Sequence, residues 1–430
     1  MTMYSAENQG SGQLPYEAEP DWLTILRKRG LDAAGNLQLP KLEKTNLQRW
    51  PLQQQGICRM PELAMSLDEL PKSIKKWVYT DNLLVQRNSG PLIKHLTEGL
   101  QKQGMILTDL ETAAQQYPEL VKPYFMQAVQ TEENLLTAQH AAHWRGGAFI
   151  YIPEGVNVET PLQTLFYVDE SDTLFMPHVL VIAEDHSSVT LVENTMSSLD
   201  KSVAVNQAIM EVFVGEGATV NVVSLHQLER DSIDLTYRRA IVEQDGRVNW
   251  LIGEMNWGKS MSDTASVLKG EGAGSDIKSI LVGSGSQTMN ITARTVHFGK
   301  NSPSDMVIRG VMREQSTAIL NGITKIEKGA SGANGQQTEK ILMLHPEARG
   351  DANPILLIDE DDVKAGHAAS VGQVNSEQLY YMMSRGISRV EAERLIVYGF
   401  LAPVVAEVPL EGVATQMQAL VEQKLGQIKE

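Results

Sequence analysis

The chain has 430 residues, of which 42% are hydrophobic and 21% charged, and this composition is that of an ordinary folded protein. Its formal net charge of −16 argues against nucleic acid or an anionic membrane surface as a partner. No run of about 18 apolar residues is present, so no membrane span is expected. The polar start does not resemble a signal peptide. The single cysteine, Cys58, permits no disulfide within the chain and favours a cytoplasmic location.

Residues 1–145 are predicted to form a largely helical N-terminal domain. Within this domain, His140 and His143 stand three residues apart on an expected helix, a spacing at which two imidazoles can share a metal ion. No third ligand lies nearby in the sequence, so a structural role is the better interpretation. Apolar residues recur at helical spacing in four segments, Asp21 to Arg29, Ser89 to Gln103, Asp109 to Gln130 and Glu132 to His143.

Residues 146–373 have the pattern of a β-rich repeat domain. Short β-type runs alternate with acidic or Gly-containing turns, and Val189, Val220 and Val248 follow three such turns at intervals of 31 and 28 residues. A recurring period of this length is typical of a repeat architecture, because one repeat of short strands cannot bury its inward face alone. The pattern therefore predicts a β-helix, and an antiparallel β-sandwich is the structural alternative.

Residues 374–430 change to a helical period. Ser388 and Glu391 form a capping box at the start of one expected helix. Val413, Met417 and Leu420 lie on the apolar face of another. This C-terminal helical domain can shield the last coil of the β-helix or provide a surface for a partner, and the pattern leaves both roles open.

A phosphate-loop pattern, G-x-x-x-x-G-K-S, occurs at Gly253–Ser260. Asp359 and Glu360 follow an apolar run, as the Mg²⁺-binding acid of such ATPases does. The context is unsuitable, because Met261 to Leu268 resembles a strand and a phosphate loop needs a following helix. A P-loop-type ATPase is therefore the weaker alternative. A β-helix enzyme acting on polysaccharide is another, although such enzymes are usually secreted.

The stretch Asn353 to Val374 carries the most specific signals in the chain. Four acids, Asp359 to Asp362, follow an apolar run. His367 then stands among alanines and glycines, which allow another backbone or a cluster to approach closely. The simpler interpretation is that this histidine is only a polar residue at the end of the repeat.

Motifs around this stretch resemble the SufB/SufD family, the scaffold subunits of the SUF iron–sulfur cluster assembly machinery. The resemblance covers most of the chain and is densest from Gly335 to Val404. It implies a mainly β protein with a right-handed parallel β-helix core flanked by N-terminal and C-terminal helical domains. The residues that carry the resemblance are Gln336–Thr338, Ala348, Pro354, Asp361–Lys364, His367, Val371–Gly372 and Ser384–Ile387.

The resemblance implies a non-catalytic scaffold subunit of a cytoplasmic SufBCD-type complex. The chain would pair with SufB through edge strands of its β-helix and bind the SufC ATPase through its C-terminal helices. A homodimer is a further partner state that the sequence leaves open. ATP hydrolysis in SufC would reshape the interface at which clusters form.

The resemblance also makes His367 a candidate iron or cluster ligand at the SufB interface. Within the family the chain is more similar to the SufD branch, because the SufB branch is expected to bring cysteines to the cluster. Ala365 stands where some relatives have a cysteine, and one cysteine cannot hold a cluster. We therefore expect the isolated chain to bind no cofactor. An iron–sulfur cluster would be present transiently at the SufB interface, with its remaining ligands supplied from outside this chain.

Overall fold

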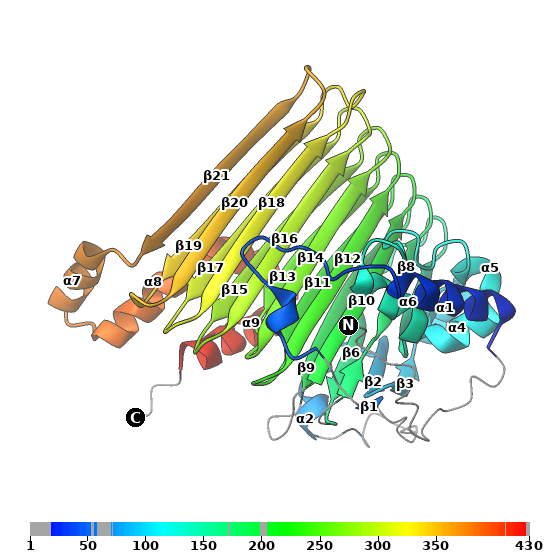
Figure 1. Cartoon of the computed structure of the whole chain (residues 1–430), viewed down its shortest axis with the longest axis horizontal. Coiled ribbons are helices and arrows are strands. Elements are labelled where there is room, and N and C mark those ends of the chain that lie inside the picture. The colour runs from blue at the N-terminus through cyan, green and yellow to red at the C-terminus, as the bar shows by residue number, and fades with distance from the viewer. Residues whose placement is uncertain are drawn as a thin grey trace.

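The computed structural model describes residues 19–52, 56–57, 70, 72–170, 173–197, 204–408 and 410–426. Two long β-sheets form the body, and helices pack near both of its ends (Figure 1). Cys58 lies outside the described residues. The helices in chain order are α1 (Asp21–Ala34), a 3₁₀ turn (Leu47–Arg49), α2 (Lys72–Lys75), α3 (Glu98–Lys102), α4 (Leu110–Gln116), α5 (Pro118–Val121), α6 (Leu135–His143), α7 (Ser376–Ser384), α8 (Arg389–Val405) and α9 (Glu411–Leu425).

From β8 onwards, successive strands alternate between the two sheets, and neighbouring strands within each sheet are parallel. The first sheet contains, from its N-terminal end, β4 (Ile106–Asp109), β5 (Gly147–Ile152), β8 (His178–Ala183), β10 (Ala204–Val214), β12 (Ile233–Val242), β14 (Lys259–Leu268), β16 (Thr288–His297), β18 (Thr317–Ile326) and β20 (Arg349–Ile358), with β1 (Gly56–Ile57) and β7 (Thr173–Phe175) beside this row. The second sheet contains β3 (Gly90–His95), β2 (Leu83–Arg87), β6 (Leu162–Val168), β9 (Ser188–Ser197), β11 (Thr219–Gln227), β13 (Arg247–Glu254), β15 (Gly274–Gly283), β17 (Pro303–Met312), β19 (Asn334–Met343) and β21 (Lys364–Gln373).

The repeat predicted from the valine spacing is confirmed. Val220 on β11 pairs with Val189 on β9 on one side and with Val248 on β13 on the other, and all three side chains are buried. Each coil of the solenoid therefore contributes one strand to each sheet, and the inward side chains stack from coil to coil. Because the neighbours are parallel, the antiparallel sandwich alternative is wrong.

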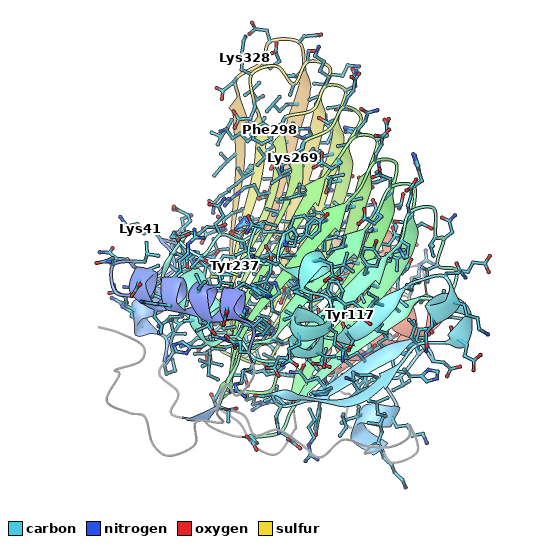
Figure 2. The ribbon with its side chains drawn as sticks, turned by 90° about the vertical axis from the view of Figure 1, so that its right-hand side faces the viewer. Lys41, Tyr117, Tyr237, Lys269, Phe298 and Lys328 are labelled. Carbon is cyan, nitrogen blue, oxygen red and sulfur yellow. The ribbon has the colours of Figure 1, made fainter. Side chains whose placement is uncertain are left out.

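Tight turns connect the two sheets at each coil. Asp245 adopts a left-handed conformation at φ 51°, and Gly217 does so at φ 62° in the preceding turn, where a glycine is favoured because it has no Cβ. Lys269, Phe298 and Lys328 lie in turns of successive coils and follow one another along the same edge of the solenoid (Figure 2). The turns therefore recur once per coil, as the strands do.

The N-terminal end of the solenoid is closed by antiparallel strands. β3 pairs antiparallel with β2, and β4 pairs antiparallel with β5, so residues before 146 extend both sheets. The helix predicted over Ser89 to Gln103 is wrong for its first half, which is β3, and only α3 is helical there. Leu92 and Ile93 are both buried in this strand. Pairing with β2 therefore decided the structure of the segment, although its apolar residues have helical spacing. The helix predicted from Asp21 is confirmed as α1.

The C-terminal helices predicted from the helical period are confirmed. Val397 and Leu401 of α8 and Met417 of α9 are buried against Val223 and Ile280 on the outer side of the second sheet. These two helices therefore cover a sheet face, while α7 extends beyond it near the end of β21 (Figure 1). None of the helices in the described ranges is long and apolar enough to cross a membrane.

Candidate functional site

The C-terminal end of the solenoid differs from its N-terminal end because no described strand or helix covers it. β20 and β21 are the last strands of the two sheets, and each has one partner strand among the described residues. Inward positions that are buried in earlier coils are open here. Ile358 pairs with the fully buried Ile326 yet is 42% exposed, and Val371 is 41% exposed beside the buried Ile341. The hydrophobic interior is thus open to solvent at this end.

β21 positions His367 on the side of the strand that faces the solenoid interior. Its register partner on β19 is Gln337, whose side chain is buried between the sheets. Partner residues of parallel strands point to the same face, so His367 shares the inward face with Ala365 and Val371. Because no coil follows, the imidazole is exposed. The edge position predicted for His367 is consistent with this placement.

The free edge of β21 also presents backbone groups. The N–H groups of Lys364 and Val374 donate to the carbonyl oxygens of Ala333 and Met343, at N···O distances of 2.9 and 3.3 Å. Backbone groups alternate in direction along a strand, so the odd-numbered residues between them, His367 included, present their N–H and C=O groups away from β19. Such an edge is a template for a strand of another chain.

Two buried polar side chains of β19 lie next to this edge, and the sequence analysis did not identify them as site residues. The Oε1 atom of Gln337 is buried without a hydrogen-bond partner in the described part of the chain, and the buried carboxylate of Glu339 interacts only with the backbone N–H groups of Gly322 and Asn353. Burial raises the pKa of Glu339 to about 7, and the backbone N–H groups of Gly322 and Asn353 offset this only in part. Unsatisfied buried groups are rare in completed structures, so this position is prepared for an additional partner.

The strand pattern holds a signal that could have identified Glu339. In GQQTEKI, Gly335, Gln337, Glu339 and Ile341 share one face by alternation, and Ile341 belongs to the core. The face of a polar strand can be assigned only when its register against an apolar neighbour is known. That register came from the structure.

The position two residues before His367 carries no ligand. Ala365 is half-buried and packs against Ile326, Ala330 and Ala333 in a small apolar cluster. A methyl group cannot coordinate iron, so Ala365 adds no ligand beside His367.

The phosphate-loop hypothesis is wrong. Gly253–Ser260 spans the end of β13, a turn and the start of β14, which continues as a strand to Leu268. No helix N-terminus therefore follows to bind phosphate. Glu254 is fully buried, and the Lys259 ammonium lies over the Trp50 ring, 5.9 Å from its centroid.

The acids of the same hypothesis lie elsewhere. Asp359 and Glu360 follow the end of β20, whereas Lys259 starts β14, so they lie at opposite ends of parallel strands in the first sheet. The Oε2 atom of Glu360 accepts a hydrogen bond from the N–H of Gly329 at 2.9 Å, and this bond, with that from Asp361, lowers the pKa of Glu360. The acidic run therefore forms an exposed turn.

His140 belongs to a buried polar chain. Its Nδ1 atom lies 3.0 Å from the carbonyl oxygen of Gln207, and its Nε2 atom lies 3.2 Å from Nδ1 of His178. His178 continues through Nε2 to Oε2 of Glu211 at 3.0 Å. Burial lowers the pKa of His140 well below its ordinary value and that of His178 to about 3. These contacts, made away from His143, support the structural role indicated for His140.

The helices beyond β21 carry an exposed apolar surface. Its members lie on α7 and at the start of α8, and a groove of about 530 Å³ runs between the two helices beside Tyr381, Met382 and Leu395. An exposed group of large apolar side chains on one surface is a mark of a protein-binding site. We call this surface the α7/α8 patch; it comprises Tyr380 (74% exposed), Tyr381 (58%), Met383 (44%), Val390 (55%) and Leu395 (43%).

Two family models match the chain. The model described as "SUF system FeS cluster assembly, SufBD core domain" matches residues 166–400, and the one described as "SufBD protein N-terminal region" matches residues 83–164. The chain is 45% identical over 414 residues to the "Iron-sulfur cluster assembly protein SufD" of Bacillus subtilis (strain 168), covering 95% of each protein. It is 28% identical over 419 residues to an "Iron-sulfur cluster assembly SufBD family protein" of Staphylococcus aureus (strain USA300), covering 94% of this chain and 89% of that relative.

Proposed function

The chain belongs to the SufBD family of iron–sulfur cluster assembly proteins, and on this premise we propose that it is a non-catalytic scaffold subunit of a cytoplasmic SufBCD-type complex. It pairs with SufB at β20 and β21 and binds the SufC ATPase at the α7/α8 patch. The observation that carries the proposal is the open C-terminal end of the solenoid, where two edge strands, an exposed interior and His367 come together.

Pairing with SufB at this end is supported by the unpaired backbone groups and the exposed apolar side chains of the last coil. The strands β20 and β21 offer backbone donors and acceptors to a strand of another chain. The exposed parts of Val371 and Ile358 offer apolar area, whose burial favours association by about 25 cal/mol per Å² before the entropic cost of association is included. A second solenoid of the same family has the shape and strand direction to supply both. A second copy of this chain is the competing occupant.

Docking of SufC at the α7/α8 patch is supported by the difference among the C-terminal helices. The apolar residues of α9 and of the second half of α8 are buried against the second sheet, so they are already used by the fold. Those of α7 and of the first turns of α8 face solvent. The α7/α8 patch is therefore the part of the C-terminal domain that is free to bind a partner helix or groove.

His367 acts in this proposal as the protein ligand that this chain presents to the cluster, which is the cargo of the complex. A neutral imidazole coordinates iron well. Thiolate ligands have to come from SufB or from a sulfur donor, because Ala365 offers none. Glu339 and Gln337 lie on the same inward face, and their oxygens accept hydrogen bonds from groups that SufB brings to the interface.

Co-expression of the chain with SufB and SufC tests the proposal. We expect the three proteins to co-purify and the complex to contain iron and acid-labile sulfide, while the isolated chain contains neither and does not hydrolyse ATP. A chain that purifies as a stable homodimer in the presence of SufB, or that binds ATP on its own, would contradict the proposal.

A further inference from the structure

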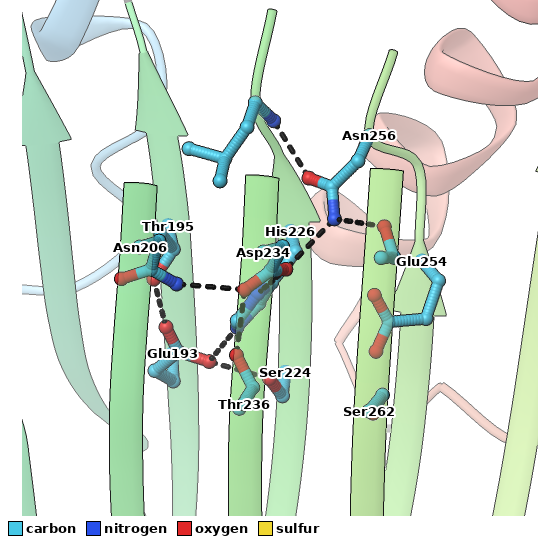
Figure 3. Close-up of polar contacts among 12 residues, drawn as sticks. Glu193, Thr195, Asn206, Ser224, His226, Asp234, Thr236, Glu254, Asn256 and Ser262 are labelled. Atoms are coloured by element: carbon cyan, nitrogen blue, oxygen red, sulfur yellow. Dashed lines mark hydrogen bonds and ion pairs between the residues drawn. The ribbon is translucent and has the colours of Figure 1, made fainter. Parts of the chain in front are cut away.

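An ionic cluster lies in the interior of the solenoid, well away from the open end. Figure 3 shows it between the two sheets, at strands β9 to β14. A large cluster of aliphatic and aromatic side chains fills much of the interior around it. Burying a charged group in such surroundings destabilises the fold unless the group is paired or binds an ion. The charges and partners of this cluster therefore show whether an ion is needed. Its charged members are Glu193, His226, Asp234, Arg238 and Glu254, all less than 4% exposed.

The register of the strands brings three potential metal ligands together. His226 on β11 pairs directly with Glu254 on β13, one coil further along, and both point inward. Asp234 on β12 faces them from the other sheet, with its Oδ2 atom 2.6 Å from Nδ1 of His226. One ligand atom from each of the three residues lies within 4.8 Å of the other two.

The hydrogen bonds of the cluster leave one carboxylate oxygen without a partner. Asp234 receives a hydrogen bond from Nδ2 of Asn256 at 2.7 Å, in addition to its contact with His226. The Oε2 atom of Glu254, by contrast, is fully buried and makes no hydrogen bond to any residue that the structure describes. Glu254 points toward His226 and Asp234 in Figure 3.

Arg238 pairs with only one of the two carboxylate oxygens of Glu254, through a long ion pair. Its Nη1 atom makes a short hydrogen bond to Oγ of Ser262 at 2.8 Å, and the Oε1 atom of Glu254 is 3.4 Å away. Its Nη2 atom lies 2.9 Å from Nε2 of His226, and its Nε atom 3.2 Å from Oγ of Ser224. The guanidinium therefore divides its N–H groups among Ser224, Ser262, His226 and one oxygen of Glu254, and leaves the other oxygen without a partner.

The charges of the cluster do not balance. Glu193, Asp234 and Glu254 carry −3 together, and Arg238 carries +1. The sum is −2 with a neutral His226 and still −1 with an imidazolium. An unbalanced charge in a dry interior destabilises the fold, whereas a divalent cation beside a neutral imidazole would bring the sum to zero.

We propose that His226, Asp234 and Glu254 form a binding site for one divalent first-row metal ion inside the solenoid. An imidazole with two carboxylates is a ligand set for ions such as Zn²⁺, Fe²⁺ or Mn²⁺. The ion gives the unpaired oxygen of Glu254 a partner, and Asn256 holds Asp234 in orientation, as outer partners of metal ligands do. The site joins three successive strands, β11 to β13, and stabilises the stacking of the coils around it.

This site is independent of the cluster-assembly proposal. It lies on strands β11 to β13, whereas His367 lies on β21, at the end of the same sheet. A structural ion there would be retained by the isolated chain. Loss of the ion should lower the stability of the solenoid without removing the edge that binds SufB.

The position of Asn256 indicates how the site is reached. Its side chain contacts Asp234, and its carbonyl oxygen accepts a hydrogen bond from Nζ of Lys424 at 2.5 Å. Lys424 lines a surface pocket of about 930 Å³ together with Trp257. Asn256 thus contacts both the cluster and a side chain that lines the pocket, and the cluster itself is buried. Exchange in the folded protein is therefore expected to be slow, so the metal should be offered while the chain folds.

Metal content of the purified full-length chain tests the proposal. The chain is expressed in medium supplemented with Zn²⁺, washed with a chelator to remove surface ions, and measured by inductively coupled plasma mass spectrometry. We expect one zinc ion per chain, and a visible d–d absorption typical of nitrogen and oxygen ligands when Co²⁺ replaces Zn²⁺. Wild-type protein that is folded and free of metal after this treatment would overturn the proposal.

Two variants identify the ligands. Glu254→Gln keeps the shape of the side chain but removes a ligand oxygen, so retained zinc should fall by about tenfold or more. His297→Gln is the matched control, because His297 is a fully buried histidine of the same solenoid whose ring contacts Ser302 and Ser304. Circular dichroism establishes that both variants are folded. Equal zinc in wild type and Glu254→Gln would mean that the cluster is an ion-pair network without a metal.

Discussion

Glu339 is the side chain whose surroundings should change most when a partner covers the open end of the solenoid. It is buried in the free chain, and its carboxylate interacts only weakly, with the backbone N–H groups of Gly322 and Asn353. Burial raises its pKa from 4.5 to about 7. The folded state therefore holds this proton more tightly than the unfolded state, and the free energy of unfolding falls as the pH rises through the window from about 4.5 to about 7.

The variant Glu339→Gln should remove this pH dependence, because an amide does not titrate. At pH 5 the variant and the wild type should have similar melting temperatures, since the carboxyl group is then largely protonated in the folded state. At pH 8 the variant should melt higher than the wild type by about 2 °C or more. Differential scanning calorimetry of the isolated chains at the two pH values measures this. The same difference between the proteins at both pH values would show that Glu339 is not protonated in the folded chain.

At this scale the sequence analysis singled out His367, whose role stays a prediction, and did not single out Glu339, and the reason is physical. His367 is recognisable because the motif around it resembles a family motif. Glu339 lies in the polar run Gln336 to Lys340, which suggests an exposed strand. Only its register against Met306 and Ile308 of the preceding coil, both buried, shows that alternate residues of the run point inward.

Among the elements, α7 and the start of α8 differ from the other C-terminal helical segments in having an exposed apolar side. The second half of α8 and most of α9 are held by the outer face of the second sheet. Removing everything after Gln373 would therefore expose that face as well as delete the docking surface. Point substitutions on the α7/α8 patch separate the two effects.

Tyr380→Ala should weaken SufC binding without changing the fold. Tyr380 is the most exposed member of the patch at 74%, and tyrosines at the centre of interfaces contribute about 2 kcal/mol or more to binding, roughly a 30-fold change in Kd. Isothermal titration of SufC into the chain measures the change. Phe298→Ala is the control, because Phe298 is an exposed aromatic residue (50%) on a turn of the solenoid. Unchanged affinity in Tyr380→Ala would place the SufC contact elsewhere.

The helix predicted over Ser89 to Gln103 shows where element prediction failed. Leu92, Leu96 and Leu100 have helical spacing, but Gly90 to His95 pairs with β2 instead. A short apolar run fits either a strand or a helix turn, and the nearby edge of a sheet decided between them. The C-terminal helices were predictable because Ser388 caps the N-terminus of α8 and apolar residues continue at helical spacing over several turns.

As a whole, the molecule is a solenoid with two unlike ends. Antiparallel strands and helices α4 to α6 close the N-terminal end, whereas β20 and β21 leave the C-terminal end open (Figure 1). Solenoids need a cap at each end, because a terminal coil otherwise exposes both strand edges and interior. This asymmetry supports the proposal that SufB covers the open end.

Val371→Lys should prevent SufB from covering the open end of the solenoid. Val371 faces the interior at the open end and is 41% exposed, so the lysine can reach solvent in the free chain but would be buried in a paired one. In co-expression, SufB should be lost from the purified chain while SufC is retained. Tyr380→Ala should give the reverse pattern. Ile25→Lys on α1, at an exposed apolar residue (69%), is the control for the added charge. Retention of SufB by Val371→Lys would mean that the open end is not the pairing surface.

The repeat architecture was predictable from sequence because each coil repeats the same turn and inward valine, as Val189, Val220 and Val248 show. The open end was not, since the final coils have the same β pattern as those before them. Only the three-dimensional structure shows at which coil the stacking ends.

The central claim is that His367 at the open end contributes directly to cluster assembly, and cluster content of the complex tests it most directly. His367→Ala and the control His345→Ala are each co-expressed with SufB and SufC; His345 lies in the turn after β19, where its ring accepts a hydrogen bond from the N–H of Glu314. An exposed polar side chain contributes little to stability, so both complexes should assemble. Iron and acid-labile sulfide per complex should fall by about tenfold in His367→Ala and remain unchanged in the control. Normal iron and sulfide in an assembled His367→Ala complex would contradict the account.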